Sequence, residues 1–415
     1  MTACLVEFLH MSRAIAHWGW LVVLGSVGIG ACGSSESSPS DQPGGTTAST
    51  GGGGGAETTP VAIPLAGRLN KITAQVTIGG TQTFALQLDT GSTTLAVAAS
   101  TCATCAAGAV SPLYAPGSGA VDQQQGASMT YGDSQANASG WSGEIYEDSV
   151  VIDGFSQTVP LDLVAITTQT DFFISGAFPY EGILGLGPSG GLVDGTTSYL
   201  DQIVAHAGAD DVFAIHVCPG VGHLWLGGYD PSFSETPPVF TPMIGDPYYY
   251  IVNVSEVQVN GTSLGLPQSV YGSAMLDTGG AGIWLPDVAY AAVVAAIGQS
   301  SAFVQEFGDA ETFFANAKSF TTTRTKAELD AALPPLTFAF GSNPTVTLQM
   351  PATESYLWPY VYKGVNRYLP ALAVIDSWFT DQGYQYYLGP AFLTGKVTVH
   401  DRRNQRVGFA HAPCE

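Results

Sequence analysis

The sequence is poor in basic residues. Only 12 of its 415 residues are Lys or Arg, against 34 that are Asp or Glu, and the formal net charge is −22. No Lys or Arg occurs from Ile72 to Ala317. A nucleic-acid-binding protein needs a basic surface to contact phosphates, so this class is excluded. Two explanations of the acidic composition stay open, tolerance of acid and the solubility of an exported protein.

Residues that bind metals are also few, and they are not spaced as ligands. The seven His form no ligand pattern, and the Cys-Ala-Thr-Cys run from Cys102 to Cys105 has no second pair to complete a zinc site. We therefore expect no metal and no cofactor. In an exported protein, a structural disulfide between Cys102 and Cys105 is favoured over metal or redox chemistry.

Long helical patterns are scarce as well. The chain is rich in Val, Thr, Tyr and Phe and contains 51 Gly, which favours an all-β protein with many turns. Its length suffices for two lobes with separate cores. The local patterns predict short helices at 197–207 and 286–298, paired strands within 61–88 that turn at Gly79-Gly80, and a strand at 212–217.

The N-terminal segment resembles a bacterial lipoprotein signal. Reading from Met11, a basic Arg13 precedes an apolar stretch that ends in Ile-Gly-Ala-Cys at Cys32. This stretch is too short and too Gly-rich to span a membrane comfortably. We expect residues 1–32 to be the signal and Cys32 to be lipidated. Because no Asp follows Cys32, resemblance to Gram-negative sorting favours the outer membrane or cell surface. An ordinary signal peptide and a misplaced start site remain alternatives.

The next segment is almost wholly Gly, Ser, Thr and Pro. Residues 33–57 include an unbroken glycine run from Gly51 to Gly55. Such a composition cannot bury enough apolar surface to fold. We expect a flexible tether between the lipid anchor and the folded part.

One motif occurs twice and dominates the rest of the chain. Asp-Thr-Gly stands at Asp89 within an apolar run from Phe84 to Val97, and again at Asp277 within 274–286, 188 residues later. An apolar run, a Gly-containing turn and a second apolar run predict strand, turn and strand, with one carboxylate at the turn. Two such carboxylates brought together share a proton, so one can accept a proton from water while the other donates one.

With both motifs in place, the chain from about residue 58 to its C-terminus resembles the pepsin-like aspartic peptidases. The resemblance implies an all-β, bilobal acid protease fold with a central interlobe sheet and a few short helices. The N-terminal lobe would span 58–220, the lobe crossing 221–245 and the C-terminal lobe 246–415. Such enzymes hydrolyse peptide bonds with two Asp, here Asp89 and Asp277.

The resemblance also assigns supporting roles within the two loops. Thr90 and Thr278 would form hydrogen bonds across the axis between the lobes, and Gly91 and Gly279 would complete the turns. Ser92 would donate a hydrogen bond to the outer oxygen of Asp89.

A flap hairpin over the substrate is the next feature that the resemblance predicts. Tyr131, Gly132 and Asp133 follow the first motif at the family spacing and precede a strand-like run. Each lobe also carries an apolar element ending in Gly that would run beside its Asp loop, at 181–187 and at 387–389. This repetition indicates two homologous lobes.

Two positions depart from the family pattern. Gly280 stands where relatives have Thr or Ser, so the outer hydrogen bond to Asp277 is missing unless another group supplies it. A carboxylate that loses such a bond has a higher pKa, and we expect the pair to work at less acidic pH than pepsin. Ala96 replaces a Trp that is frequent in pepsins, which predicts a more open pocket wall. Gly280 is also expected to face the substrate.

A second disulfide is expected from the resemblance. In relatives the strand that leads to Cys218 and the C-terminal strand, here expected at 397–410, share the central sheet, and Cys414 lies just beyond that strand. We predict a Cys218 to Cys414 bridge, a type of link that stabilises by roughly 2 to 4 kcal/mol.

The sequence thus predicts an exported, lipid-anchored, monomeric aspartic endopeptidase that acts on extended polypeptides. It would contact a membrane only through its anchor and bind no nucleic acid. A catalytically inactive pepsin-like binding or inhibitor protein is the main alternative. A serine hydrolase using Ser189 in a Gly-x-Ser-x-Gly motif is disfavoured, because Pro188 and Gly190-Gly191 make a helix after Ser189 improbable.

Overall fold

β-Strands are the predominant secondary structure in this protein, whose computed structural model describes residues 60–68, 71–131, 139–170, 173–174, 180–316, 318–342, 345–362 and 365–414. The segments predicted to be a signal and a tether, together with Gly132 and Asp133, lie outside these residues. The first-half strands are β1 (Ile63–Arg68), β2 (Lys71–Ile78), β3 (Gln82–Asp89), β4 (Leu95–Ala98), β5 (Val121–Tyr131), β6 (Ser139–Ile152), β7 (Val159–Gln169), β8 (Gly182–Gly185), β9 (Val212–Cys218) and β10 (Val221–Leu226).

The second half also contains more strand than helix. Its strands are β11 (Val239–Ile244), β12 (Ile251–Val259), β13 (Thr262–Ser263), β14 (Gly272–Leu276), β15 (Ile283–Leu285), β16 (Leu336–Phe340), β17 (Val346–Met350), β18 (Leu357–Tyr362), β19 (Val365–Pro370), β20 (Leu372–Val374), β21 (Tyr386–Leu388), β22 (Lys396–Asp401) and β23 (Arg406–His411). This content agrees with the predicted fold class.

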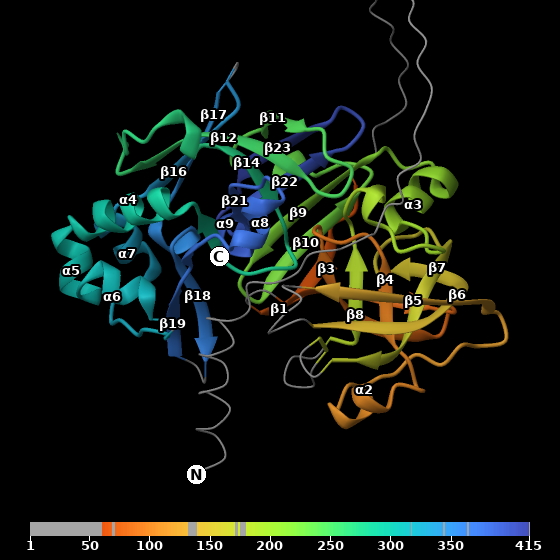
Figure 1. The fold of residues 1–415 in the computed structure, drawn as a ribbon. Helices are drawn as coiled ribbons and strands as arrows, with labels where there is room; N and C mark the ends of the chain where they lie inside the picture. Colours follow the sequence, from red (N-terminus) through yellow and green to blue (C-terminus); the bar gives the residue numbers. More distant parts are fainter. Residues whose placement is uncertain are drawn as a thin grey trace, which may run out of the picture.

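The helices are short and lie outside the sheets (Figure 1). They are α2 (Ala103–Ala107), α3 (Tyr199–Ala207), α4 (Asp287–Gly298), α5 (Ser301–Phe307), α6 (Ala310–Ala315), α7 (Lys326–Ala332), α8 (Ser377–Asp381) and α9 (Pro390–Leu393), with the 3-10 turns η1 (Ser189–Gly191), η2 (Pro231–Phe233), η3 (Gln268–Val270) and η4 (Ala352–Glu354). Local caps fix where they begin: Ser198 caps α3, and Thr325 with Glu328 forms a capping box on α7.

A central antiparallel sheet contains strands from both halves of the chain. Its order is β1, β10, β9, β22, β23 and β11. In Figure 1 these strands lie between strands β3 to β8 on the right and helices α4 to α7 on the left. The C-terminal segment 397–410 was expected to be one strand, and that prediction is wrong. Residues 402–405 form a turn that splits it into the β22–β23 hairpin.

The two halves repeat one strand arrangement. In the first half, β8 runs parallel to β3 and antiparallel to β4, and β4 runs parallel to β7. In the second half, β21 has the same relation to β14 and β15, and β15 runs parallel to β20. The internal repeat predicted from the sequence is therefore confirmed at the level of strand pairing.

The other local predictions agree well with the structure. The helices expected at 197–207 and 286–298 are α3 and α4, and the strand expected at 212–217 is β9. The expected flap strands are the antiparallel pair β5–β6. In the described part of the chain no single helix is long and apolar enough to cross a membrane. Helices α4 and α5 reach that length and apolar composition only together, and the chain bends by 91° between them.

Candidate active site

The two Asp-Thr-Gly loops meet at the junction of the halves. Asp89 ends β3 and Asp277 directly follows β14, and both side chains are fully buried. Each loop's glycine lies against the other loop's carboxylate. A Cβ added to Gly91 would lie 2.5 Å from Oδ2 of Asp277, and one added to Gly279 would lie 2.3 Å from Oδ1 of Asp89. Only glycine allows this approach, which brings the two carboxyls together.

Each carboxylate is held by one backbone N–H and one hydroxyl. Asp89 accepts from the Gly91 N–H at 2.8 Å and from the Ser92 hydroxyl at 2.6 Å. Asp277 accepts from the Gly279 N–H at 2.6 Å and, on its other oxygen, from the hydroxyl of Tyr387 at 2.8 Å. The two halves thus hold equivalent carboxylates with hydroxyl donors from different residues.

Two threonines bond the loops to each other. The Thr90 N–H donates to the hydroxyl of Thr278 at 3.1 Å, and the Thr278 N–H donates to that of Thr90 at 3.0 Å. Each hydroxyl in turn donates across the junction, Thr90 to the Leu276 carbonyl and Thr278 to the Leu88 carbonyl. The structure therefore brings together Thr90 and Thr278 in the predicted cross-axis arrangement.

The electrostatics of the pair favour a shared proton. Burial, the charge of Asp89 and a hydrogen bond between the two carboxyls raise the pKa of Asp277 well above its usual range, while bonds from Gly279 and Tyr387 oppose this. Burial and the charge of Asp277 also raise the pKa of Tyr387, so its hydroxyl stays protonated and remains a donor. Such a pair can accept one proton and donate another.

Tyr131 ends the first flap strand beside this pair. Its hydroxyl accepts a hydrogen bond from the Trp141 indole at 3.1 Å, and its ring stacks on Phe173 with centroids 5.1 Å apart. Burial and the charge of Asp89 raise the pKa of its phenol. The flap residues Gly132 and Asp133 lie outside the described residues.

Comparison with known proteins gives the family. The sequence profile described as "Eukaryotic aspartyl protease" matches residues 71–412. The chain belongs to this family. An aspartic protease of Phaffia rhodozyma is 29% identical over 341 residues, covering 81% of this chain and 75% of the relative. A renin of Ovis aries is 25% identical over 350 residues, 80% of this chain and 77% of the relative.

A further relative is covered less fully. A beta-secretase of Strongylocentrotus purpuratus is 24% identical over 363 residues, which are 79% of this chain but 63% of that protein. The chain thus spans less than two thirds of this relative. All three relatives are matched over most of the present aspartyl protease chain.

The two departures from the family pattern have different outcomes. At Gly280 the outer hydrogen bond to Asp277 is not missing, because Tyr387 supplies it from β21. At Ala96 the expectation of a more open pocket wall stays a prediction. Ala96 is fully buried in an apolar cluster that also contains Tyr131 and Trp141.

A polar chain beneath the pair was not foreseen from the sequence. The Lys71 ammonium donates to the Gln87 side chain at 2.9 Å, and the Gln87 amide donates to the Gly279 carbonyl at 3.0 Å. The ammonium also lies 4.8 Å from the ring centre of Tyr180. Burial lowers the pKa of Lys71 to about 8, although Asp89 and Asp277 oppose the shift. One signal was available: Lys71 is the last basic residue before the long stretch that has none.

Both predicted disulfides are present. Cys102 bonds Cys105, and Cys218 at the end of β9 bonds Cys414 beyond β23. His216 lies near the second bridge, with its Nε2 3.3 Å from the Cys218 sulfur. Because both sulfurs are in the bridge, this group has no thiolates to offer a metal.

The serine motif does not form a nucleophile elbow in this aspartyl protease. Ser189 begins the 3-10 turn η1, not a helix, and its hydroxyl bonds the Asp201 carboxylate. A nucleophile would need a histidine base in place of this acid. The structure therefore gives no support to a serine hydrolase that uses Ser189.

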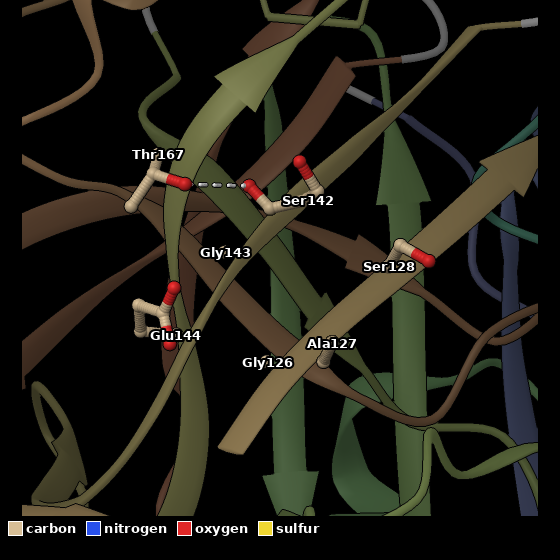
Figure 2. A pocket seen from close by; sticks show the side chains of 7 residues that line it. All are labelled: Gly126, Ala127, Ser128, Ser142, Gly143, Glu144 and Thr167. Atoms are coloured by element: carbon tan, nitrogen blue, oxygen red, sulfur yellow. Dashed lines mark hydrogen bonds between the residues drawn. The ribbon is translucent and has the colours of Figure 1, made fainter. Parts of the chain in front are cut away.

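A separate hollow of about 340 Å³ lies on the flap hairpin (Figure 2). Gly126, Ser128, Glu144 and Thr167 are among its lining residues, and Thr167 bonds the Ser142 carbonyl at 3.4 Å. Neither aspartate lines it. We assign it no part in the chemistry.

Proposed function

We propose that this chain is an aspartic endopeptidase in which Asp89 and Asp277 hydrolyse peptide bonds through an activated water. The observation that supports this most is the reciprocal loop contact, in which the glycine of each loop lies against the carboxylate of the other. Family membership supports the reaction class. Thr90, Thr278, Gly91 and Gly279 would hold the geometry.

The reaction follows from a pair that carries one proton. The ionised carboxyl takes a proton from water as the water oxygen attacks the peptide carbonyl carbon, and the protonated carboxyl donates to the carbonyl oxygen. The tetrahedral diol then collapses as a proton passes to the amide nitrogen and the C–N bond breaks. No covalent enzyme intermediate forms. The proton belongs to the pair and is not assigned to one residue.

The substrate would be an extended polypeptide that lies over the pair. Tyr131, at the end of the flap strand β5, would contact it, together with Gly132 and Asp133 of the flap and with Gly280. Ser92 would hold Asp89, as its 2.6 Å hydrogen bond supports.

The test is cleavage of casein between pH 3 and 8 by the full chain, with and without the inhibitor pepstatin, beside Asp89→Asn and Asp277→Asn. We expect pepstatin-sensitive cleavage that each substitution reduces by at least about 10³-fold, since each removes an acid–base group. A folded wild type that binds pepstatin but cleaves nothing would instead support the inactive binding or inhibitor protein.

We also propose that the chain is exported as a lipid-anchored monomer on the cell envelope of a Gram-negative bacterium. The support is the sequence from Met11 to Cys32 and the Gly-rich tether at 33–57. Metabolic labelling with a radioactive fatty acid tests this. Label on the wild type and none on Cys32→Ser would support the anchor, and equal labelling of both would contradict it.

A further inference from the structure

The two halves hold the outer oxygen of their aspartates in different ways. In the first half Ser92, three residues after Asp89, donates to that oxygen. In the second half the equivalent loop residue is Gly280, and the donor comes from another strand, as Tyr387 on β21. The internal repeat allows the two solutions to be compared position by position.

Strand register identifies the first-half counterpart of Tyr387. Leu88, just before Asp89, pairs with Leu184 on β8, and Leu276, just before Asp277, pairs with Leu388 on β21. The preceding residues on these strands are Ile183 and Tyr387. One half therefore combines Ser with Ile, and the other combines Gly with Tyr.

Space makes the two combinations mutually exclusive. A Cβ added to Gly280 would lie 1.5 Å from the Tyr387 hydroxyl oxygen and 2.4 Å from its Cζ atom. Any side chain at residue 280 would thus displace the tyrosine. Tyr387 can occupy its position only because residue 280 is a glycine. Gly280 therefore does more than remove a loop hydroxyl that could donate to Asp277.

The tyrosine is held firmly in place. Its ring stacks on Trp284 with centroids 4.4 Å apart and meets the edge of Phe379 at 5.4 Å. It is almost fully buried, and its hydroxyl reaches Oδ2 of Asp277 at 2.8 Å. A buried aromatic with a locked ring delivers its hydroxyl at a fixed position.

We propose that Tyr387 is a positioning residue for Asp277. Its hydroxyl replaces the loop hydroxyl that is absent because residue 280 is a glycine. This inference deepens the proposed peptidase function and rests on it. The phenol donates to the ionised form of Asp277, favours that form, and fixes the orientation of the carboxyl toward Asp89.

Removing only the hydroxyl tests the role. In Tyr387→Phe the ring and its packing remain, and we expect kcat to fall about tenfold with little change in KM. The basic limb of the pH–rate profile, which reports loss of the last proton from the pair, should move up by about one pH unit, because a hydrogen bond to a charged acceptor is worth roughly one to two units. A merely structural role would lower activity without moving this limb.

Tyr386→Phe is the matched control. Tyr386 is the adjacent residue on β21 and is equally buried, but its hydroxyl donates to the Val270 carbonyl at 3.1 Å and not to the pair. We expect the pH–rate profile of this variant to match that of the wild type.

A sharper test places the first-half combination of Ser and Ile at the equivalent positions of the second half. Gly280→Ser alone should abolish activity or folding, and Tyr387→Ile alone should behave like Tyr387→Phe. The double variant Gly280→Ser/Tyr387→Ile should return the basic limb to within about 0.3 units of the wild type, since serine now donates as Ser92 does. Tyr387→Phe with an unshifted limb, or a double variant no better than Tyr387→Ile, would overturn the proposal.

A readout without catalysis separates this inference from the peptidase proposal. If the wild type proves inactive, urea unfolding of wild type and Tyr387→Phe is compared from pH 3 to 8. The hydrogen bond favours ionised Asp277, so the loss of stability in the variant should grow as pH rises through the titration of the pair. A loss that is independent of pH, as expected for Tyr386→Phe, would refute the positioning role even in an inactive protein.

Discussion

Lys71 is a buried cation close to the aspartate pair. Its ammonium is linked through Gln87 to the carbonyl of Gly279, and Asp89 and Asp277 both stabilise its charge. Interactions between charges are reciprocal, so Lys71 must favour the ionised forms of the pair. It therefore adds a positive charge to a site in which burial works against ionisation.

Lys71→Met should move the pH–rate profile to higher pH. Without the ammonium, each ionised state of the pair is less favourable, and a shift of about half a unit to one unit is expected. The measurement is kcat/KM on a peptide substrate from pH 2.5 to 8.

Lys396→Met provides the control for that shift. Burial also lowers the pKa of Lys396 to about 8, but its attractive partner is Glu354 and not the aspartate pair. We expect no movement of the profile in this variant. A shift as large as that of Lys71→Met would mean that the effect is a general consequence of removing a buried lysine.

At the same scale, the aspartates were predictable and Tyr387 was not. Asp89 and Asp277 each stand in a local motif, and the repetition of that motif identifies them. Tyr387 lies 110 residues after Asp277, and its contact depends on the parallel register of β14 and β21. The sequence predicted the strand that contains Tyr387, but no local pattern tells that its hydroxyl reaches a carboxylate.

Among the elements, the central sheet depends on strands that are far apart in the sequence. β9 pairs with β22, and β22 pairs with β23, whose far end is tied to β9 by the Cys218 to Cys414 bridge. This bridge closes a loop with a sequence separation of 196, whereas the Cys102 to Cys105 bridge has a separation of 3.

Removal of the long-range bridge should cost more stability than removal of the short one. A bridge restricts the unfolded chain more when its loop is longer, so Cys218→Ser/Cys414→Ser should lose roughly 2 to 5 kcal/mol. Cys102→Ser/Cys105→Ser is the matched pair and should lose about 2 kcal/mol or less. Urea unfolding of both variants measures the difference. An equal or larger loss for the short bridge would contradict the argument.

Sequence patterns predicted the elements better than their connections. Helix α3 was expected from a local sequence pattern, and the β5–β6 hairpin was expected from the resemblance to the pepsin-like family. The β22–β23 hairpin was missed because apolar residues continue on both sides of the turn. Its turn is held by bonds from Asn404 and Arg406 to Asp401, which only the folded chain reveals.

The whole molecule is joined at the aspartate pair by the two threonines. Thr278→Val keeps the shape but leaves the Leu88 carbonyl and the Thr90 N–H without their partner in the other half. Because both groups are buried, the loss should be about 2 kcal/mol or more, accompanied by a large loss of activity. Thr398→Val is the control, since the buried Thr398 hydroxyl has no hydrogen-bond partner among the described residues. Chemical unfolding that shows equal losses for both would contradict this role.

The net charge of −22 should make stability depend on salt. At neutral pH the acidic groups repel one another, and salt screens that repulsion. Raising NaCl from 20 mM to 500 mM should therefore raise Tm by a few degrees at pH 7 and by much less near the isoelectric point. Thermal unfolding at the two pH values tests this. A shift that does not depend on pH would show that self-repulsion contributes little.

The most direct test of the central claim is the pH–rate profile of peptide cleavage by the wild type beside Asp89→Asn and Asp277→Asn. We expect a bell-shaped, pepstatin-sensitive profile for the wild type, and cleavage reduced by at least about 10³-fold in both variants at every pH, although both remain folded. Substantial cleavage by either folded variant would contradict the claim that the two carboxyls act as one acid–base unit.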